Sequence, residues 1–302
     1  MNKLLFACIA GLAIVLAGCQ TPQTRSASPP AVKQSNVNGV TLTYLDQGQG
    51  APVVFVHSAF ADHRFWEAQR EAIAKTYRYI ALDQRYFGKS PWPDNTSNYS
   101  LATHTADLAA FIRELKAGPV HVVGSSYGGA VVLALAVQYP DLVRSVFVNE
   151  PALNSIVTDA ADRAVLGDAA KGLGPIVAAS KAGDLAQATR LFTDWVNGQP
   201  GGFDTIPAAM RAVHLDNGRT IPLLLAAPPP TPITCAQLGN IKVPVAVTKG
   251  QQARQSFRII ADTAARCIPG SQLTTIPNAH HMAPYENPGA FNNALFAFLA
   301  RQ

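Results

Sequence analysis

Short apolar runs alternate along the chain with longer stretches of helical spacing. Runs that are apolar at nearly every position indicate strands buried on both faces of a parallel sheet. Their alternation with helices predicts an α/β fold, with a mostly parallel, doubly wound sheet covered by helices on both faces. The predicted strands cover residues 53–56, 79–82, 120–123, 143–148, 243–248 and 273–276, and the predicted helices cover 64–75, 101–115, 128–139, 159–170, 184–196, 206–214 and 288–300.

Two segments depart from this alternation. Residues 37–46 alternate apolar and polar positions around Asn38-Gly39, which predicts an exposed hairpin or edge strand. From residue 151 to 235 the strand patterns disappear and alanine-rich helical stretches replace them. The core would then consist of residues 37–150 and 236–302, with an inserted helical cap at 151–235 between them.

The first residues have the pattern of an export signal. Lys3 precedes an unbroken apolar run, Leu4–Ala17, which is too short to span a bilayer comfortably and is typical of a signal peptide. The run ends in Leu16-Ala17-Gly18-Cys19, which resembles the lipobox of bacterial lipoproteins. This resemblance implies removal of a signal peptide of residues 1–18 and attachment of lipid to Cys19.

An N-terminal lipid would anchor the exported protein to a membrane, since several acyl chains bind far more firmly than one. Gln20 stands where an aspartate would signal retention in the inner membrane, which favours the outer membrane. Residues 19–36 are rich in Thr, Ser, Pro, Gln and Ala and are expected to form a flexible tether. A plain secretory signal with a chance cysteine and a retained membrane anchor are the alternatives.

The composition is that of an ordinary globular protein. Of the 302 residues 48% are hydrophobic and 14% are charged, and the formal net charge is +5. The basic residues are scattered, without runs or interleaved aromatic residues, which argues against a nucleic-acid groove. The length suits one catalytic domain with an insertion better than two independent domains.

Export would leave two of the four cysteines able to pair. Cys8 would leave with the signal peptide and Cys19 would carry lipid, so Cys235 and Cys267 would remain in an oxidising compartment. We expect a disulfide between them that closes a loop of about 30 residues. The alternative is a pair of buried, unpaired thiols.

The segment Gly124-Ser125-Ser126-Tyr127-Gly128 stands between a predicted buried strand and a predicted buried helix. This is the G-x-S-x-G nucleophile elbow in the context that the motif requires. The turn leaves almost no space for side chains two positions before and after the nucleophile. The glycines therefore identify Ser126 as the nucleophile, because Ser125 would be out of register with them.

With this elbow the chain resembles the α/β-hydrolase superfamily, from about residue 37 to the C-terminus. His57-Ser58-Ala59-Phe60 is similar to the His-Gly oxyanion loop of that family, with Ser58 at the usual glycine. The resemblance implies that the backbone N–H groups of Ala59 and Tyr127 stabilise the oxyanion of a tetrahedral intermediate.

A second family turn follows the next strand. Residues 83–90 are similar to the Asp-x-Arg-Gly-x-Gly-x-Ser turn of the superfamily. We interpret Asp83 and Arg85 as scaffolding of that turn and not as catalysts.

The base is expected after the last strand. Residues 278–288 resemble the family's Asn-Ala-Gly-His…Glu-x-Pro segment, which places His281 in the catalytic position and His280 where a glycine usually stands. A neutral imidazole there would take the serine proton and return it to the leaving group. Neighbouring histidines can also mark a metal site, but no ligand spacing accompanies them, so neither a metal nor a cofactor is expected.

The acid is missing from its usual place. The turn after the strand at 243–248 reads Gly250-Gln251-Gln252-Ala253 and contains no carboxylate. A minority of the superfamily takes its acid from the end of the preceding core strand, where this chain has Glu150. Glu150 is therefore expected to orient the base. Asp262 on a helix face and Asp216 in the cap are the weaker candidates.

These residues predict a serine hydrolase that cleaves a carboxylic ester or lactone of a small molecule through an acyl-enzyme intermediate. The serine argues against epoxide hydrolase and haloalkane dehalogenase chemistry, for which related enzymes use an aspartate at the elbow. Cap residues, among them Phe192, Trp195 and Phe203, either form an apolar substrate pocket or pack the cap helices. Amide or carbon–carbon bond cleavage, cofactor-free oxygenation and a non-catalytic binding lipoprotein are the alternatives.

Overall fold

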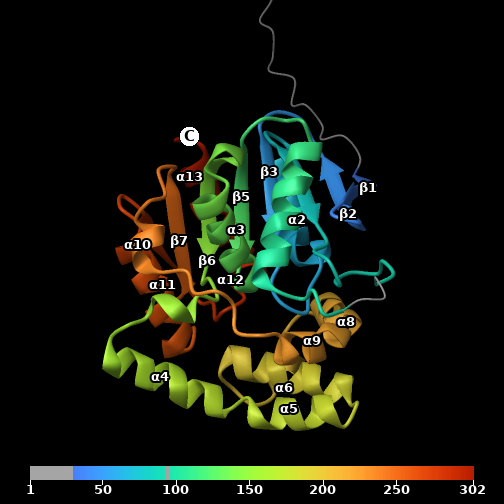
Figure 1. The fold of residues 1–302 in the computed structure, drawn as a ribbon, viewed down its shortest axis with the longest axis vertical. Coiled ribbons are helices and arrows are strands. Elements are labelled where there is room, and N and C mark those ends of the chain that lie inside the picture. Colours follow the sequence, from blue (N-terminus) through green and yellow to red (C-terminus); the bar gives the residue numbers. More distant parts are fainter. Residues whose placement is uncertain (1–29, 93–95) are drawn as a thin grey trace, which may run out of the picture.

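Eight strands form a single sheet in this computed structural model, which describes residues 30–92 and 96–302. In chain order the strands are β1 Ala31–Val37, β2 Val40–Gln47, β3 Pro52–Val56, β4 Arg78–Leu82, β5 Val120–Ser125, β6 Val143–Asn149, β7 Val245–Gly250 and β8 Gln272–Ile276. They lie in the order β1-β2-β4-β3-β5-β6-β7-β8 (Figure 1). All pairings from β4 to β8 are parallel, and only β1 and β2 run antiparallel to their neighbours. The predicted α/β fold with a mostly parallel sheet is confirmed.

The helices in the described part of the chain include every helix that the sequence predicts, with ends that shift by at most three residues. The helices α5, α7, α9, α10 and α12 have no predicted counterpart, and α11 was expected only as a helix that carries Asp262, without bounds. None of the described helices is both long and apolar enough to cross a bilayer. The helices are α1 Glu67–Ala74, α2 Leu101–Glu114, α3 Tyr127–Gln138, α4 Ala160–Lys171, α5 Gly174–Lys181, α6 Leu185–Asn197, α7 Gly202–Thr205, α8 Ala208–Asn217, α9 Ile221–Ala226, α10 Cys235–Leu238, α11 Gln255–Cys267, α12 Ala283–Glu286 and α13 Pro288–Leu299.

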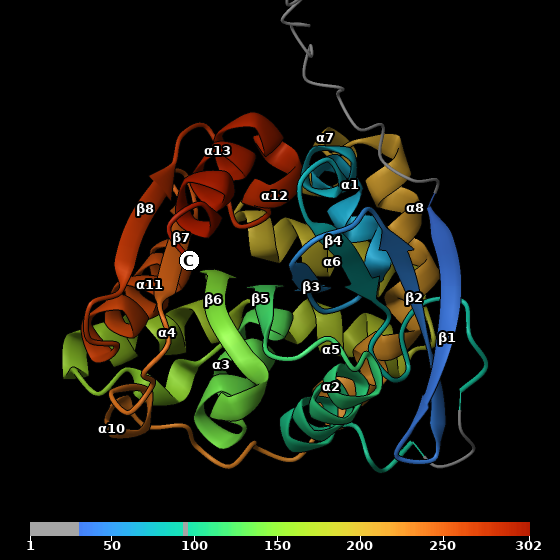
Figure 2. The ribbon, with the colours of Figure 1, turned by 90° about the horizontal axis from the view of Figure 1, so that it is seen from above.

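Successive residues of the central strands point to opposite faces of the sheet, so each strand contributes to two apolar layers. On β3, Val54 and Val56 belong to the layer that α2 and α3 cover, whereas Val53 and Phe55 belong to the layer of α1 and α13. Figure 2 shows these helices on the two sides of the sheet. The continuous apolar strands of the sequence are therefore explained by burial on both faces.

The N-terminal edge differs in part from expectation. The predicted signal peptide, residues 1–18, and Cys19 lie outside the described residues. β1 begins at Ala31, so the tether predicted over 19–36 is wrong from residue 31 onward. The side chains of β1 are mostly exposed, and the strand forms because its backbone pairs with β2, which leaves little apolar pattern to recognise. The predicted hairpin is present, since Asn38 and Gly39 form its turn with φ of 47° and 75°.

Strand β7 starts at Val245, two residues later than the segment 243–248 predicts. Pro244 has no N–H to donate, and its carbonyl accepts a hydrogen bond from the N–H of Val146. The carbonyl of Pro244 thus already bonds to β6, and the first paired residue of β7 is Val245, opposite Val146. At its other end β7 continues to Gly250, which pairs with Ile276 of β8.

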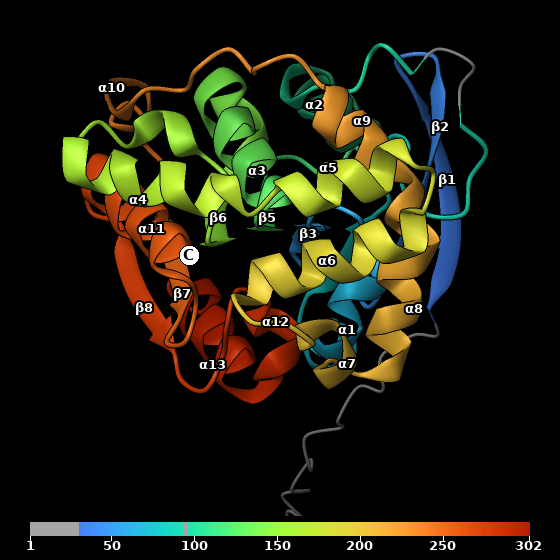
Figure 3. The ribbon, with the colours of Figure 1, turned by 90° about the horizontal axis from the view of Figure 1, so that it is seen from below.

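The cap consists of α4 to α9, which lie between β6 and β7 in the chain and across the carboxyl ends of the parallel strands (Figure 1). Seen from below in Figure 3, α5 and α6 run side by side over the sheet, and α4 lies against α11. Phe60, in the loop after β3, packs edge to face on Phe192 of α6 at 4.6 Å. The side chain of Asn217 accepts a hydrogen bond from the N–H of Gly88 at 2.8 Å, and Arg219 donates to the carbonyl of Gly88. Buried polar contacts thus fix the α8 end of the cap to the loop after β4.

A disulfide joins Cys235, at the start of α10, to Cys267, at the end of α11. Their Cα atoms are 5.0 Å apart and the two residues are separated by 32 positions in the sequence. The pairing predicted from the cysteine count is therefore present. It connects the segment that leaves the cap to a helix of the core.

Replacing both cysteines by serine is expected to lower the free energy of unfolding by about 3–4 kcal/mol, because the open loop of the unfolded chain regains its entropy. Urea unfolding of the oxidised protein and of the Cys235→Ser/Cys267→Ser variant measures the difference. The reduced wild-type protein is the control, and it should unfold like the variant. Equal midpoints for all three would contradict the prediction.

Candidate active site

Ser126 occupies a sharp turn between β5 and α3, with φ of 54° and ψ of −114°. A Cβ atom on Gly128 would lie 2.3 Å from the carbonyl oxygen of Val56, and one on Gly124 would lie 2.5 Å from the carbonyl of Gly128. Both glycines of the motif are therefore required by close backbone approach. The strained turn holds Ser126 partly exposed at the carboxyl end of the sheet.

His281 and Glu150 form a buried pair beside this turn. The Nδ1 atom of His281 lies 2.5 Å from Oε2 of Glu150, and each side chain is 1% exposed or less. The other carboxylate oxygen, Oε1, accepts a hydrogen bond from the N–H of Gly250 at 2.7 Å. A proton on Nδ1 directed at the carboxylate leaves Nε2 of the imidazole free to act as a base.

Glu150 reaches the histidine from the end of β6, as expected from the absence of a carboxylate in the turn after β7. Glu150 follows the last residue of β6 with φ of 39°, and its N–H donates to the carbonyl of Thr248. The two other candidate acids are engaged elsewhere. Asp262 pairs with Lys249 at 2.5 Å, and Asp216 pairs with Arg64 at 2.8 Å. Neither of these carboxylates contacts the histidine.

Asn149 is a site residue that the sequence analysis missed. Its Nδ2 donates to the carbonyl of His281 at 2.9 Å and to the hydroxyl of Ser125 at 3.3 Å, and its Oδ1 accepts from the hydroxyl of Thr248. Its own carbonyl accepts a hydrogen bond from the N–H of Ser126. The fully buried amide therefore joins the elbow to the histidine loop. Its position directly before Glu150 was the only signal in the sequence.

In the described part of the chain, the Ser126 hydroxyl and His281 make no direct hydrogen bond within 3.5 Å. Catalytic hydrogen bonds are often long without substrate and tighten when it binds. Asn149 keeps both residues on one network. The arrangement therefore brings the three residues that the sequence predicts to the same end of the sheet.

One expected oxyanion donor belongs to the elbow and the other to the loop after β3. Tyr127 is the first residue of α3, and the first N–H groups of a helix have no acceptor within it. Ala59 follows β3, and among the described residues its N–H finds no acceptor. Ser58, at the usual glycine, is buried, its carbonyl lies 2.7 Å from Nδ1 of His57, and the N–H of Gln84 donates to His57 Nε2.

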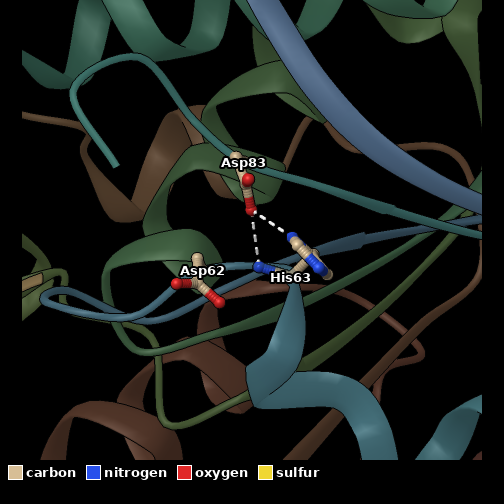
Figure 4. A group of neighbouring side chains, drawn as sticks. All are labelled: Asp62, His63 and Asp83. Carbon is tan, nitrogen blue, oxygen red and sulfur yellow. Dashed lines mark hydrogen bonds and ion pairs between the residues drawn. The ribbon is translucent and has the colours of Figure 1, made fainter. Parts of the chain in front are cut away.

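The turn after β4 has the scaffolding role that its sequence predicts. Arg85 forms a buried ion pair with Asp107 at 2.7 Å, and one oxygen of Asp83 accepts the N–H of His63 and lies 2.8 Å from its Nδ1. Figure 4 shows this contact beside Asp62, whose ligand atoms lie within 4.8 Å of the other two. That spacing would suit a cation. However, Arg64 and Asn217 already occupy both oxygens of Asp62, so a metal ion would have to displace a guanidinium.

Residues 51–288 match the family model of the alpha/beta hydrolase fold. Two curated relatives match over 36% of the chain. One is an epoxide hydrolase from Caballeronia sordidicola, 36% identical over 112 residues, and the other is a 2-hydroxy-6-oxo-6-(2'-aminophenyl)hexa-2,4-dienoic acid hydrolase from Metapseudomonas resinovorans, 34% identical over 114 residues. The matched segments cover only 34% and 39% of the length of these relatives.

Among solved structures, the carboxylesterase CesB from Bacillus subtilis is similar over 91% of this chain and 93% of its own, with a TM-score of 0.72. The two sequences are 18% identical. At this identity the likeness shows the fold alone.

Two buried histidines next to the site are neutral in the folded protein. Burial lowers the pKa of His104 to about 3 and the pKa of His214 to about 4. The Tyr127 hydroxyl donates to Nδ1 of His104 at 2.6 Å, and Nε2 of His104 donates to the carbonyl of Arg85 at 3.2 Å. This pattern requires the neutral ring and fixes the side chain of Tyr127, the residue after Ser126.

The free energy of unfolding is expected to decrease as the pH falls from about 6.5 toward 4. In this pH range the two histidines bind protons in the unfolded chain but not in the folded protein. The free energy of unfolding therefore falls by up to about 1.4 kcal/mol per pH unit for each histidine. Urea unfolding between pH 7 and 5 should show a shallower decline for His104→Gln than for the wild type. Burial raises the pKa of Glu286 to about 7, which adds an opposite slope common to both proteins. Parallel curves would refute the assignment.

Proposed function

Because the chain belongs to the α/β-hydrolase fold family, we propose that it is a serine hydrolase that cleaves a carboxylic ester or lactone of a small molecule through an acyl-enzyme intermediate. The buried Glu150–His281 pair beside the Ser126 elbow carries this proposal. A buried carboxylate aimed at Nδ1 of a histidine, with a strained serine near it, is the arrangement that nucleophilic acyl transfer requires.

In the proposed reaction, the hydroxyl oxygen of Ser126 attacks the substrate carbonyl while Nε2 of His281 takes its proton. The carboxylate of Glu150 stabilises the imidazolium that forms. The N–H groups of Ala59 and Tyr127 stabilise the oxyanion, and one such donor typically lowers the barrier by about 3–4 kcal/mol. The imidazolium then protonates the leaving alcohol oxygen as the C–O bond breaks. Water repeats these steps on the acyl-enzyme and releases the acid.

The nature of the nucleophile separates this proposal from the activity named for one relative. A serine at the elbow forms an ester with an acyl carbon and is a poor nucleophile for an epoxide, for which the related enzymes use aspartate. Hydrolysis of a carbon–carbon bond is the second candidate, because one relative is a dienoic acid hydrolase and the same three residues would serve it. Phe192 and Phe203, which were candidates for a substrate pocket, are buried in the apolar core, and Trp195 packs against it.

A fluorophosphonate probe is expected to label the wild-type protein and not Ser126→Ala. Glu150→Gln should lower kcat on p-nitrophenyl esters by about 10²–10⁴-fold, because the imidazolium loses its counter-charge and its fixed tautomer. Asp262→Asn is the matched control, since that carboxylate pairs with Lys249, and it should retain near-normal turnover.

The outcomes distinguish the alternatives. Labelling that persists in Ser126→Ala would contradict Ser126 as the nucleophile. If Glu150→Gln kept full turnover while Asp262→Asn or Asp216→Asn lost it, the acid of the triad would be that aspartate and not Glu150. Oxygen consumption without turnover of any ester or lactone would indicate cofactor-free oxygenation. A protein that neither labels nor turns over any of these compounds would be a binding protein.

We also propose that the protein is an exported bacterial lipoprotein of the outer membrane, from the apolar run and the lipobox pattern that ends at Cys19. In bacterial cells fed with an alkyne-tagged palmitate, the wild type should incorporate the tag and Cys19→Ser should not. Cys8→Ser is the matched control and should incorporate it normally. Equal labelling of Cys19→Ser and the wild type would refute the anchor.

A further inference from the structure

Phe257, near the start of α11, lies flat against the imidazole of His281. The two ring centroids are 3.9 Å apart and the ring planes are inclined by only 25°. Glu150 binds the imidazole at its Nδ1 edge and leaves the faces of the ring free. Phe257 stacks on one of these faces and thereby fixes the plane of the ring. The sequence pattern around Phe257 contains no motif that would have drawn attention to it.

The cap holds Phe257 in this position. Trp195 of α6 meets its ring edge to face, with centroids 5.7 Å apart and planes at 86°. The guanidinium of Arg254 lies 5.1 Å from the centre of the Trp195 ring and donates to the Trp195 carbonyl at 2.6 Å. The Phe257 ring is thus confined between the cap tryptophan and the histidine.

We infer that Phe257 is a positioning residue for the base, which keeps the His281 ring in its reactive plane and stabilises the imidazolium with its π face. This inference rests on the proposed function. A cation over an aromatic face is stabilised most where water is excluded, and His281 is buried. The stabilisation appears only after the imidazole has taken the serine proton, so it lowers the barrier of the chemical step.

Other charged groups surround the base and contribute to its pH dependence. Glu150 contacts the imidazole directly, and Glu286 of α12 binds the N–H of the neighbouring His280. From α11 and the adjoining strand, Arg254 faces Trp195, and Lys249 and Asp262 form their own pair. A change confined to Phe257 leaves all these charges in place, so a difference between variants reports the ring alone.

Phe257→Leu keeps an apolar side chain and removes the π face. We expect kcat to fall about 2–30-fold with little change in KM, and the acid limb of the kcat/KM profile to move down by about 0.4–1.5 pH units. The acid limb moves to lower pH because loss of the π face destabilises the protonated ring. Phe257→Trp, which restores an aromatic face, should recover most of both losses. Phe296→Leu, the same change at a half-buried position of α13, is the matched control and should match the wild type.

NMR titration of the His281 ring in Ser126→Ala, with and without Phe257→Leu, separates the two proposals, because it requires no turnover. A lower titration midpoint together with the kinetic losses supports the inference. Unchanged kinetics and an unchanged midpoint in Phe257→Leu overturn it, even if the enzyme hydrolyses esters. If turnover falls while neither the NMR titration midpoint nor the acid limb of the kinetic profile moves, Phe257 has a purely structural role. The inference fails in that case too. A protein without hydrolase activity whose midpoint still shifts would overturn the proposed function alone.

Discussion

The buried hydrogen bond between Glu150 and His281 is the constraint on which the rest of this end of the sheet depends. A carboxylate without contact to water is stable only if both of its oxygens are bonded, and here the imidazole and the N–H of Gly250 provide those bonds. Leaving a buried polar group without its partner typically costs about 1–3 kcal/mol, and more if the group is charged. The backbone around the pair is closely packed, since a Cβ atom on Gly250 would lie 2.0 Å from the carbonyl oxygen of His280. The pair therefore dictates backbone as well as side chains.

The cap meets the core in two chemically different ways. At the α8 end, Asn217 and Arg219 form directional hydrogen bonds with the turn after β4. At the α6 end Trp195 packs edge to face on Phe257, and Arg254 both lies over the Trp195 ring and donates to its carbonyl. A hydrogen bond fixes direction and distance, and aromatic pairs also have preferred geometries. Both ends of the cap are therefore fixed to the core, and the α6 end is the one that contacts the ring stacked on His281.

The sequence predicted the parts of the site that depend on neighbouring residues in the chain. The elbow and the histidine loop are recognised from consecutive residues, although Gly128 of the elbow is required by the close approach of Val56 on a neighbouring strand. Glu150 could be found only through the strand order, because its partner lies 131 positions away. Asn149 and Phe257 depend on contacts between distant elements and leave no periodic signal. The exposed strand β1 escaped prediction because backbone pairing, and not an apolar face, holds it in place.

The contact between Gly250 and Glu150 has a consequence for comparing sequences. The end of β7 here supplies an N–H in place of a side chain, so the positions after it need no carboxylate, and Gln251 to Ala253 are released from that requirement. A pattern search that demands an acid after this strand would classify the chain as inactive. Under the proposed function, such a search should also accept a glutamate directly after β6, whose second oxygen is bound by the N–H at the end of β7.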